Sequence, residues 1–280
     1  MSAVPARGAA EGSTYDPRVA LEFFKASGRP EEIAEGRTIF AEKEKGLFKR
    51  NKIYLLLNGE VGLLAGAKPI GAVKAGEIFG ELAAISQAPR SATAVAKTAC
   101  KLIALDDKEF QAALRRKPAF ALMLMSVMIR RLRETIGKLE AAGALSGDAA
   151  AKESAAFDPK HLAELLSGFS DEPLVYFDRR KPIMLAGQAG LRMYVVTEGR
   201  VVVTIGEQVV ERLGPGGAFG EASLVDQAPR LASATAETDC ALLPISRSAF
   251  LALVKMSPGF AESMLSSLAE RLRFLTSRIK

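Results

Sequence analysis

Residues 79–94 read Phe-Gly-Glu-Leu-Ala-Ala-Ile-Ser-Gln-Ala-Pro-Arg-Ser-Ala-Thr-Ala, and residues 219–234 read Phe-Gly-Glu-Ala-Ser-Leu-Val-Asp-Gln-Ala-Pro-Arg-Leu-Ala-Ser-Ala. Apolar positions differ between the two copies, whereas the Gly-Glu pair and the Pro-Arg pair are the same. A repeat that only builds a core needs apolar character and little else. Buried glutamate and arginine side chains are costly unless they are paired or bind a polar group. The pattern therefore predicts a polar ligand pocket that occurs twice.

The repeat extends over most of the chain. With the same offset of 140 residues (219 minus 79), identical residues recur far outside the motif: Tyr54 and Tyr194, Cys100 and Cys240, Pro118 and Pro258, and Arg131-Leu132-Arg133 and Arg271-Leu272-Arg273. Each copy is of ordinary domain size. We therefore expect a disordered N-terminus over residues 1–14, one domain over 15–142, a small and polar linker over 143–156, and a second domain over 157–280.

The motif resembles the phosphate-binding cassette of cyclic nucleotide-binding domains. That family includes the catabolite activator protein, the regulatory subunit of protein kinase A and cyclic nucleotide-gated channels. The resemblance covers about residues 16–280 in two copies, and it implies cyclic AMP or cyclic GMP as ligand. Carried over position by position, it assigns ligand binding to Gly80, Glu81, Leu82, Ala83, Arg90, Ser91 and Ala92 in the first copy, and to Gly220, Glu221, Ala222, Ser223, Arg230, Leu231 and Ala232 in the second.

The chemistry of these residue types agrees with the resemblance. Gly80 lets the backbone approach a ligand, and it precedes a short predicted helix whose unpaired N–H groups suit an anion. The planar fork of Arg90 suits a phosphodiester. Glu81 only accepts hydrogen bonds, so it matches a ribose 2′-hydroxyl and not a phosphate. The alternative is an internal ion pair between Glu81 and Arg90 with no ligand.

The second copy departs from the family pattern at one position. The residue after the arginine is usually Ala, Ser or Thr; the first copy has Ser91, but the second has Leu231. In the family a hydroxyl here tends to favour guanine. Leucine offers no hydrogen bond and adds bulk, so we expect unequal pockets, with the first the tighter.

The local patterns predict antiparallel β-rolls of jelly-roll type with flanking helices, an α+β class that is mainly β. Asn58-Gly59 and Glu198-Gly199 are typical of hairpin turns. The expected strands cover residues 53–57, 61–64, 92–97 and 101–105, with partners over 193–197, 200–205, 232–237 and 241–244. The expected helices cover 18–27, 81–84, 108–116 and 119–142 in the first copy, and 160–167, 247–255 and 259–280 in the second.

The last helix carries an apolar seam with alternating spacings of three and four residues: Leu265, Leu268, Leu272, Leu275 and Ile279. Such a seam is typical of paired helices. We expect this helix to pair, either across a homodimer or with the first long helix inside one chain; burial against its own roll is the alternative. In the family the corresponding helix also closes over the base. The resemblance therefore implies that four arginines contact the ligand as part of a lid: Arg131, Arg133, Arg271 and Arg273.

Composition favours a cytoplasmic regulatory protein over an enzyme. The chain is 49% hydrophobic and 25% charged, and it has two cysteines and one histidine. Those counts exclude a metal cluster of the zinc type and a disulfide framework, and no nucleophile–base set or P-loop is found. The two cysteines are expected to be buried small hydrophobes, and His161 a surface helix residue. Residues 1–14 lack the apolar region of a signal peptide, and no stretch reaches the length of a membrane span.

The output is expected to be a contact with an unidentified protein effector. The sequence ends at Lys280 without the helix-turn-helix of the catabolite activators, and no kinase-inhibitor segment precedes the first copy, so neither DNA binding nor direct kinase inhibition is predicted. The basic stretches over 43–52, 130–133 and 271–280 are interpreted as solvated surfaces. Two rivals remain: a scaffold that lost its ligand, and a receptor for another purine messenger such as a cyclic dinucleotide. Two intact Glu/Arg pairs argue against both.

Overall fold

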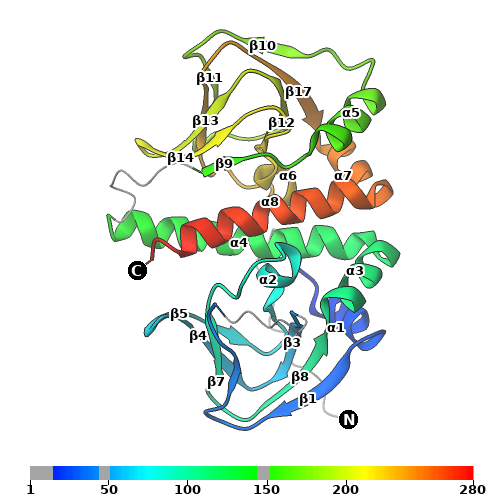
Figure 1. Ribbon diagram of the computed structural model, residues 1–280, viewed down its shortest axis with the longest axis vertical. Coiled ribbons are helices and arrows are strands. Elements are labelled where there is room, and N and C mark those ends of the chain that lie inside the picture. The colour runs from blue at the N-terminus through cyan, green and yellow to red at the C-terminus, as the bar shows by residue number, and fades with distance from the viewer. Residues whose placement is uncertain (1–14, 44–50, 144–151, 280) are drawn as a thin grey trace.

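The computed structural model describes residues 15–43, 51–143 and 152–279. Two β-rolls lie at opposite ends of the molecule, and two long helices lie side by side between them (Figure 1). The expected mainly β fold with flanking helices is thereby confirmed. The N-terminus over 1–14, most of the basic stretch over 43–52 and residues 144–151 of the expected linker lie outside the described residues.

The described residues of the first half form four helices and two four-stranded antiparallel sheets, ordered β1-β8-β3-β6 and β2-β7-β4-β5. Its helices are α1 (Pro17–Lys25), α2 (Glu81–Ile85), α3 (Asp107–Arg116) and α4 (Pro118–Ala141). Its strands are β1 (Arg29–Ile33), β2 (Thr38–Phe40), β3 (Ile53–Asn58), β4 (Glu60–Ala65), β5 (Lys68–Lys74), β6 (Ile78–Phe79), β7 (Thr93–Ala96) and β8 (Cys100–Leu105).

The second half repeats this plan with sheets ordered β10-β17-β12-β15 and β11-β16-β13-β14-β9. Its helices are α5 (Pro159–Gly168), α6 (Ala222–Asp226), α7 (Arg247–Met256) and α8 (Pro258–Thr276). Its strands are β10 (Val175–Phe177), β11 (Pro182–Met184), β12 (Arg192–Glu198), β13 (Val201–Ile205), β14 (Gln208–Leu213), β15 (Ala218–Phe219), β16 (Ser233–Ala236) and β17 (Cys240–Ser246). β9 (Lys152–Ser154), which falls within the expected linker, pairs in parallel with β14.

The two expected hairpin turns are not hairpins. β3 pairs with β8 and β6, whereas β4 pairs with β5 and β7, so the turn at Gly59 carries the chain from one sheet to the other. β3 is buried on both faces and its two edges are already occupied. Gly59 has φ +97°, and a Cβ there would lie 2.6 Å from the carbonyl oxygen of Ala99, so the crossing needs glycine. The turn at Gly199 is built in the same way.

The helix starts that the sequence predicts are present. The carboxylate of Asp16 accepts from the backbone N–H of Arg18 and caps α1, and Asp158 accepts from the N–H of His161 and caps α5. A proline occupies the first turn in both helices, where its missing N–H costs nothing. These caps fix α1 and α5 at equivalent places beside the two rolls (Figure 1).

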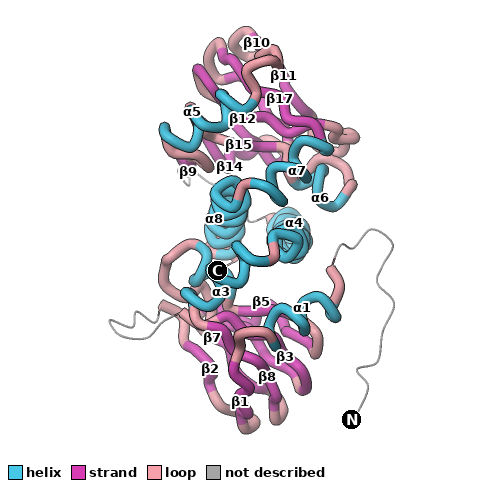
Figure 2. Tube along the Cα trace, turned by 90° about the vertical axis from the view of Figure 1, so that its right-hand side faces the viewer, coloured by secondary structure: helices cyan, strands magenta, loops and turns pink. Residues whose placement is uncertain are grey.

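The long helices α4 and α8 pair inside one chain, which confirms one of the two expected arrangements. They run in the same direction, with α3 and α7 at one end and the C-terminus at the other (Figure 1). Viewed along their axes, they fill the space between the two rolls (Figure 2). Leu124 and Met128 of α4 share one buried core with Leu265 and Leu268 of α8. The two halves are therefore joined by apolar packing and not only by the chain.

The ends of the two long helices are not equivalent in their packing. Leu132, Ile136 and Leu139 of α4 belong to the apolar core inside the second roll. The interior of the first roll forms a separate core around Tyr54 and Phe79, and no residue of α4 or α8 belongs to that core in the described part of the chain. Leu272 and Leu275 of α8 belong to the same core as those α4 residues, so part of the α8 seam packs against its own roll. The second roll is therefore filled by both long helices, and the first roll is left more open.

Other expectations about single residues are confirmed. Cys100 and Cys240 are buried and unbonded to each other, and His161 lies partly exposed on α5. Among the described residues, no helix combines the length and the hydropathy that a bilayer crossing requires.

The helix pair is open to a direct test at Leu272, which is 3% exposed. Replacing it with Glu places a carboxylate in an apolar interface, and we expect a loss of more than about 3 kcal/mol of unfolding free energy. Ala252→Glu, at an exposed position of α7, serves as the control and should change stability by less than about 0.5 kcal/mol. Urea unfolding of the full chain measures both. Equal stability of the two variants would rule out this packing.

Candidate functional site

Each half encloses a cavity between its roll and the long helices, and the repeated motif lines both. All seven cassette residues expected in the first copy line the first cavity, and all seven expected in the second line the second. The first cavity measures about 460 Å³ and the second about 80 Å³. Small-molecule sites usually measure roughly 300 to 1,000 Å³. The first cavity is therefore large enough for a nucleotide-sized ligand, and the second is contracted.

Each cassette arginine donates hydrogen bonds to two backbone carbonyl oxygens, one at the start of its own cassette and one on an earlier segment of the chain. Arg90 donates to the carbonyl oxygens of Gly80 at 2.7 Å and Lys52 at 2.9 Å. Arg230 makes the equivalent bonds, at 2.6 Å, to Gly220 and Arg192. Both arginines are buried. A side chain at Gly220 would lie 2.6 Å from Nη1 of its arginine, so only glycine permits this approach.

The guanidinium of Arg230 is a buried cation with neutral partners. Its hydrogen bonds go to carbonyl oxygens, and within the described ranges no carboxylate forms an ion pair with it. Burial lowers the pKa of Arg230 below its usual value, against the opposing influence of Tyr194 and Glu221. A buried charge without an ionic partner is unfavourable. An anion bound in the cavity beside it would remove that cost.

The cassette glutamates pair with the long helices. Glu81 is 1% exposed and accepts a short ion-pair hydrogen bond from Arg131 of α4, which also donates to the carbonyl oxygen of Ile78. Burial lowers the pKa of Arg131, but the carboxylates of Glu81, Glu77 and Glu134 together have the larger, opposite effect, so the pKa is raised. The alternative of an internal Glu81–Arg90 ion pair is wrong, because the fork of Arg90 is turned to backbone carbonyls.

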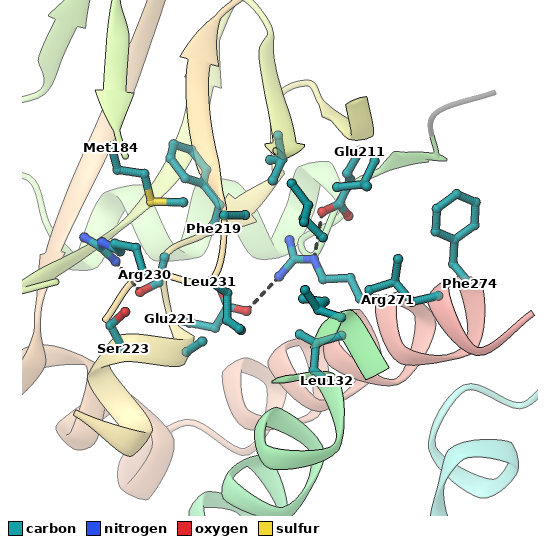
Figure 3. Close-up of a pocket in the computed structure, with 18 residues that line it drawn as sticks. Leu132, Met184, Glu211, Phe219, Glu221, Ser223, Arg230, Leu231, Arg271 and Phe274 are labelled. Carbon is teal, nitrogen blue, oxygen red and sulfur yellow. Dashed lines mark hydrogen bonds and ion pairs between the residues drawn. The ribbon is translucent and has the colours of Figure 1, made fainter. Parts of the chain in front are cut away.

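In the second half one arginine bridges two carboxylates. Arg271 of α8 lies 2.7 Å from Glu221 and 2.8 Å from Glu211 of β14 (Figure 3). Burial again opposes the charge, and the two carboxylates raise the pKa of Arg271. The position equivalent to Glu211 in the first half is Gly71 (211 minus 140). The extra carboxylate draws Arg271 across the second cavity and helps to explain its small volume.

Each cavity is completed by the long helix of the other half, which sequence reasoning missed. Residues of α8 and of the segment after it line the first cavity, namely Leu272, Thr276 and Ile279. Leu132 and Ile136 of α4 line the second. The repeated motif lies within one copy, and its residues carry no signal that points to the opposite helix.

The helix residues also give the two cavities different polarity. Thr135 and Thr276 line the first cavity, whereas their repeat equivalents, Leu275 and Ile136, line the second. A threonine hydroxyl both donates and accepts hydrogen bonds. The first cavity can therefore recognise a polar heterocycle along its helical wall, and the second offers it an apolar wall. Thr135 stands in the first long helix where the last helix has Leu275 of its apolar seam, and this polar residue is a signal for a site residue that the sequence contains.

Two of the four expected lid arginines face elsewhere. Arg131 and Arg271 line their own cavities, but Arg133 and Arg273 line neither. Arg133 binds Asp226 of the second cassette, at 2.6 Å from Oδ2, and also the carbonyl of Pro229. Arg273 binds the carbonyl of Pro89 in the first cassette, at 2.5 Å. Two positions along α4 or α8 turn the side chain to the opposite side of the helix, toward the other half.

Comparison with known proteins agrees with this geometry. A family model described as the cyclic nucleotide-binding domain matches residues 30–117 and again 174–257. The cyclic AMP receptor protein of Thermus thermophilus is 41% identical over 113 residues, 37% of this chain and 52% of that protein. A cAMP-dependent protein kinase regulatory subunit of Mucor circinelloides is 26% identical over 226 residues, 79% of this chain and 47% of that protein. The chain spans about half the length of these relatives.

A similar solved structure is the regulatory domain of Toxoplasma gondii PKA with cAMP. It is 22% identical, covers 92% of this chain and 90% of its own, and has a TM-score of 0.33.

The crossed contact between Arg133 and Asp226 predicts a stabilising link between the halves. The equivalent of Asp226 in the first cassette is Ser86 (226 minus 140), so Asp226→Ser copies the first half. We expect this variant to lose about 1.5 kcal/mol of unfolding free energy, because a charged hydrogen bond is removed from a partly buried site. The converse change, Ser86→Asp, gives Arg273 a carboxylate but removes the hydrogen bond from the Ser86 hydroxyl to the carbonyl oxygen of Leu82 (2.6 Å), so we expect no net gain in stability. Urea titration of both variants decides the matter; unchanged stability of Asp226→Ser would contradict the link.

Proposed function

Because the chain belongs to the family of cyclic nucleotide-binding domains, we propose that it is a cytoplasmic sensor of cyclic AMP, cyclic GMP or both, with two cassettes. The observation that carries this proposal is the first cavity of about 460 Å³, which combines a buried arginine, a buried glutamate and hydroxyl groups. We also propose domain limits of 15–142 and 157–280, with β9 of the expected linker added to a sheet of the second domain.

The ligand is proposed to lie along the first cavity with its phosphate at the cassette arginine and its base toward the long helices. The phosphodiester meets Arg90, and Ser91 follows on the same loop. The ribose 2′-hydroxyl donates to Glu81, a carboxylate that can accept from it and from Arg131 together. The base then extends toward Thr135 and the opposite helix. Each polar part of the nucleotide thus meets a side chain of matching chemistry.

The signal is proposed to pass to a protein effector through the α4–α8 pair. A hydroxyl that binds Glu81 alters the ion pair that joins the first cassette to α4. The same helix holds the second cassette through Arg133. Ligand in one cavity therefore acts on the other half by way of a shared helix, and it changes the surface that the two halves present together.

A ligand-free scaffold on the same fold is the second candidate. The ion pairs that Glu81 and Glu221 already make with Arg131 and Arg271 favour it, because they satisfy both carboxylates internally. The buried cation of Arg230 argues for the sensor. A receptor for a cyclic dinucleotide would need two phosphodiesters, and each cavity is lined by a single cassette arginine.

Binding is predicted to stabilise the protein measurably. Ligand at one hundred times its dissociation constant should add about 2.7 kcal/mol to the stability of the unit that binds it. Calorimetric titration and thermal unfolding with cyclic AMP and cyclic GMP test this, with 5′-AMP as a control that lacks the cyclic phosphodiester. If neither cyclic nucleotide at millimolar concentration releases heat or shifts the melting temperature, the sensor proposal fails and the scaffold is favoured.

The two pockets are predicted to be unequal, with the first the tighter. Arg90→Ala should remove the first binding event and leave the second, and Arg230→Ala should do the converse. The second event is expected to be at least about tenfold weaker, because its cavity must open at a cost of more than about 1.4 kcal/mol. Leu231→Ser should tighten the second event, especially for cyclic GMP. Titrations of the single variants assign each event, and a tighter second pocket would contradict the asymmetry.

A further inference from the structure

The second cavity contains a buried hydroxyl group without a hydrogen-bond partner. Ser223 of α6 is 3% exposed, and its Oγ makes no hydrogen bond in the described part of the chain. Two other buried side-chain atoms, on Gln111 and Glu237, share this state, but neither residue lines the first or second cavity. A buried unpaired hydroxyl costs stability, so its presence inside a cavity points to a missing partner.

The hydroxyl lies beside the cassette arginine. A Cβ placed on Gly190 would lie 2.6 Å from Cζ of Arg230 and 2.7 Å from Cβ of Ser223. Both side chains therefore pack against the same piece of backbone, at the end of the cavity opposite Arg271 (Figure 3). The buried guanidinium and the unpaired hydroxyl are both hydrogen-bond donors, and neither has an anionic partner among the residues that the structure describes.

The first cassette has no such group. The equivalent of Ser223 is Ala83 (223 minus 140), and the first hydroxyl is instead on Ser91, where the second cassette has Leu231. Among the seven expected ligand-binding residues, each cassette thus has one hydroxyl, but on a different element: the loop after the arginine in the first half, and the short helix in the second. The apparent loss of a hydroxyl at Leu231 is accompanied by a gain at Ser223.

We propose that the Ser223 hydroxyl is a ligand-binding group specific to the second cavity, where it donates a hydrogen bond to the anionic phosphate that Arg230 holds. This inference rests on the proposed function and adds to it how the second site recognises its ligand. Ser223 reads the phosphate only, because it lies at the arginine end of the cavity. The wall of Leu231, Leu275 and Ile136 gives the base no hydrogen bond, so the second site discriminates less between adenine and guanine than the first.

The test uses the full chain with Arg90→Ala as background, so that the second cavity alone is titrated. In that background Ser223→Ala should weaken cyclic AMP binding about tenfold or more, the size of a lost hydrogen bond to a charged group. Binding of adenosine, which has no phosphate, should not change. Without ligand the melting temperature should stay the same or rise, because an unsatisfied hydroxyl has been removed. A purely structural serine would lower it.

Ser126→Ala is the matched control. Ser126 is also a buried serine of a helix, but its hydroxyl donates to the carbonyl of Met123 at 2.7 Å. This change should lower the melting temperature and leave both affinities unchanged. The proposal is overturned if Ser223→Ala binds cyclic AMP as tightly as the background, or if the background binds none while Arg230→Ala still does. Failure of both cassettes in the unaltered chain would instead remove the proposed function.

Discussion

The packing of α4 against α8 is the interaction on which the rest of the molecule depends. It merges the two halves into one apolar core, and it places the end of each helix over the roll of the other half. A tandem repeat could have kept its domains apart on a linker. Here neither cavity is complete without the opposite helix, so neither half is a finished site by itself.

That arrangement connects the two cassettes through shared helices, so ligands bound in both cavities would be coupled. Each long helix carries one arginine to the glutamate of its own cassette, Arg131 or Arg271, and a second arginine to the other cassette, Arg133 or Arg273. A movement of α4 relative to its own roll would therefore also move Arg133, which contacts the second cassette. If ligand in the first site changes the affinity of the second site by some factor, ligand in the second site must change the affinity of the first by the same factor. The crossed contacts are unequal, since only Arg133 meets a carboxylate.

The sequence predicted the parts of this structure that depend on local chemistry. The Gly-Glu and Pro-Arg pairs placed all cassette residues in cavities, helices were predicted close to where α1 and α5 form, and the seam around Leu268 predicted helix pairing. The sequence could not predict contacts between residues far apart in the chain. Asn58-Gly59 carries the signal of a hairpin, and only the full occupation of both edges of β3 shows that the chain crosses between sheets there. Glu211 was missed for a similar reason, because its partner Arg271 is 60 residues away.

The differences between the cavities arise from few positions within one conserved frame. Both halves keep the cassette glycine and the buried glutamate and arginine, whose charges are costly to bury without partners. In both halves the glutamate forms an ion pair with an arginine of the long helix. Around that frame, Glu211 replaces Gly71, Leu275 replaces Thr135, and Ile136 faces the second cavity where Thr276 faces the first. Each change either adds a carboxylate that tightens the ion-pair network or removes a hydroxyl from the wall. Duplication thus preserved the costly charged groups that define a site, while the surrounding residues were free to set its volume and polarity.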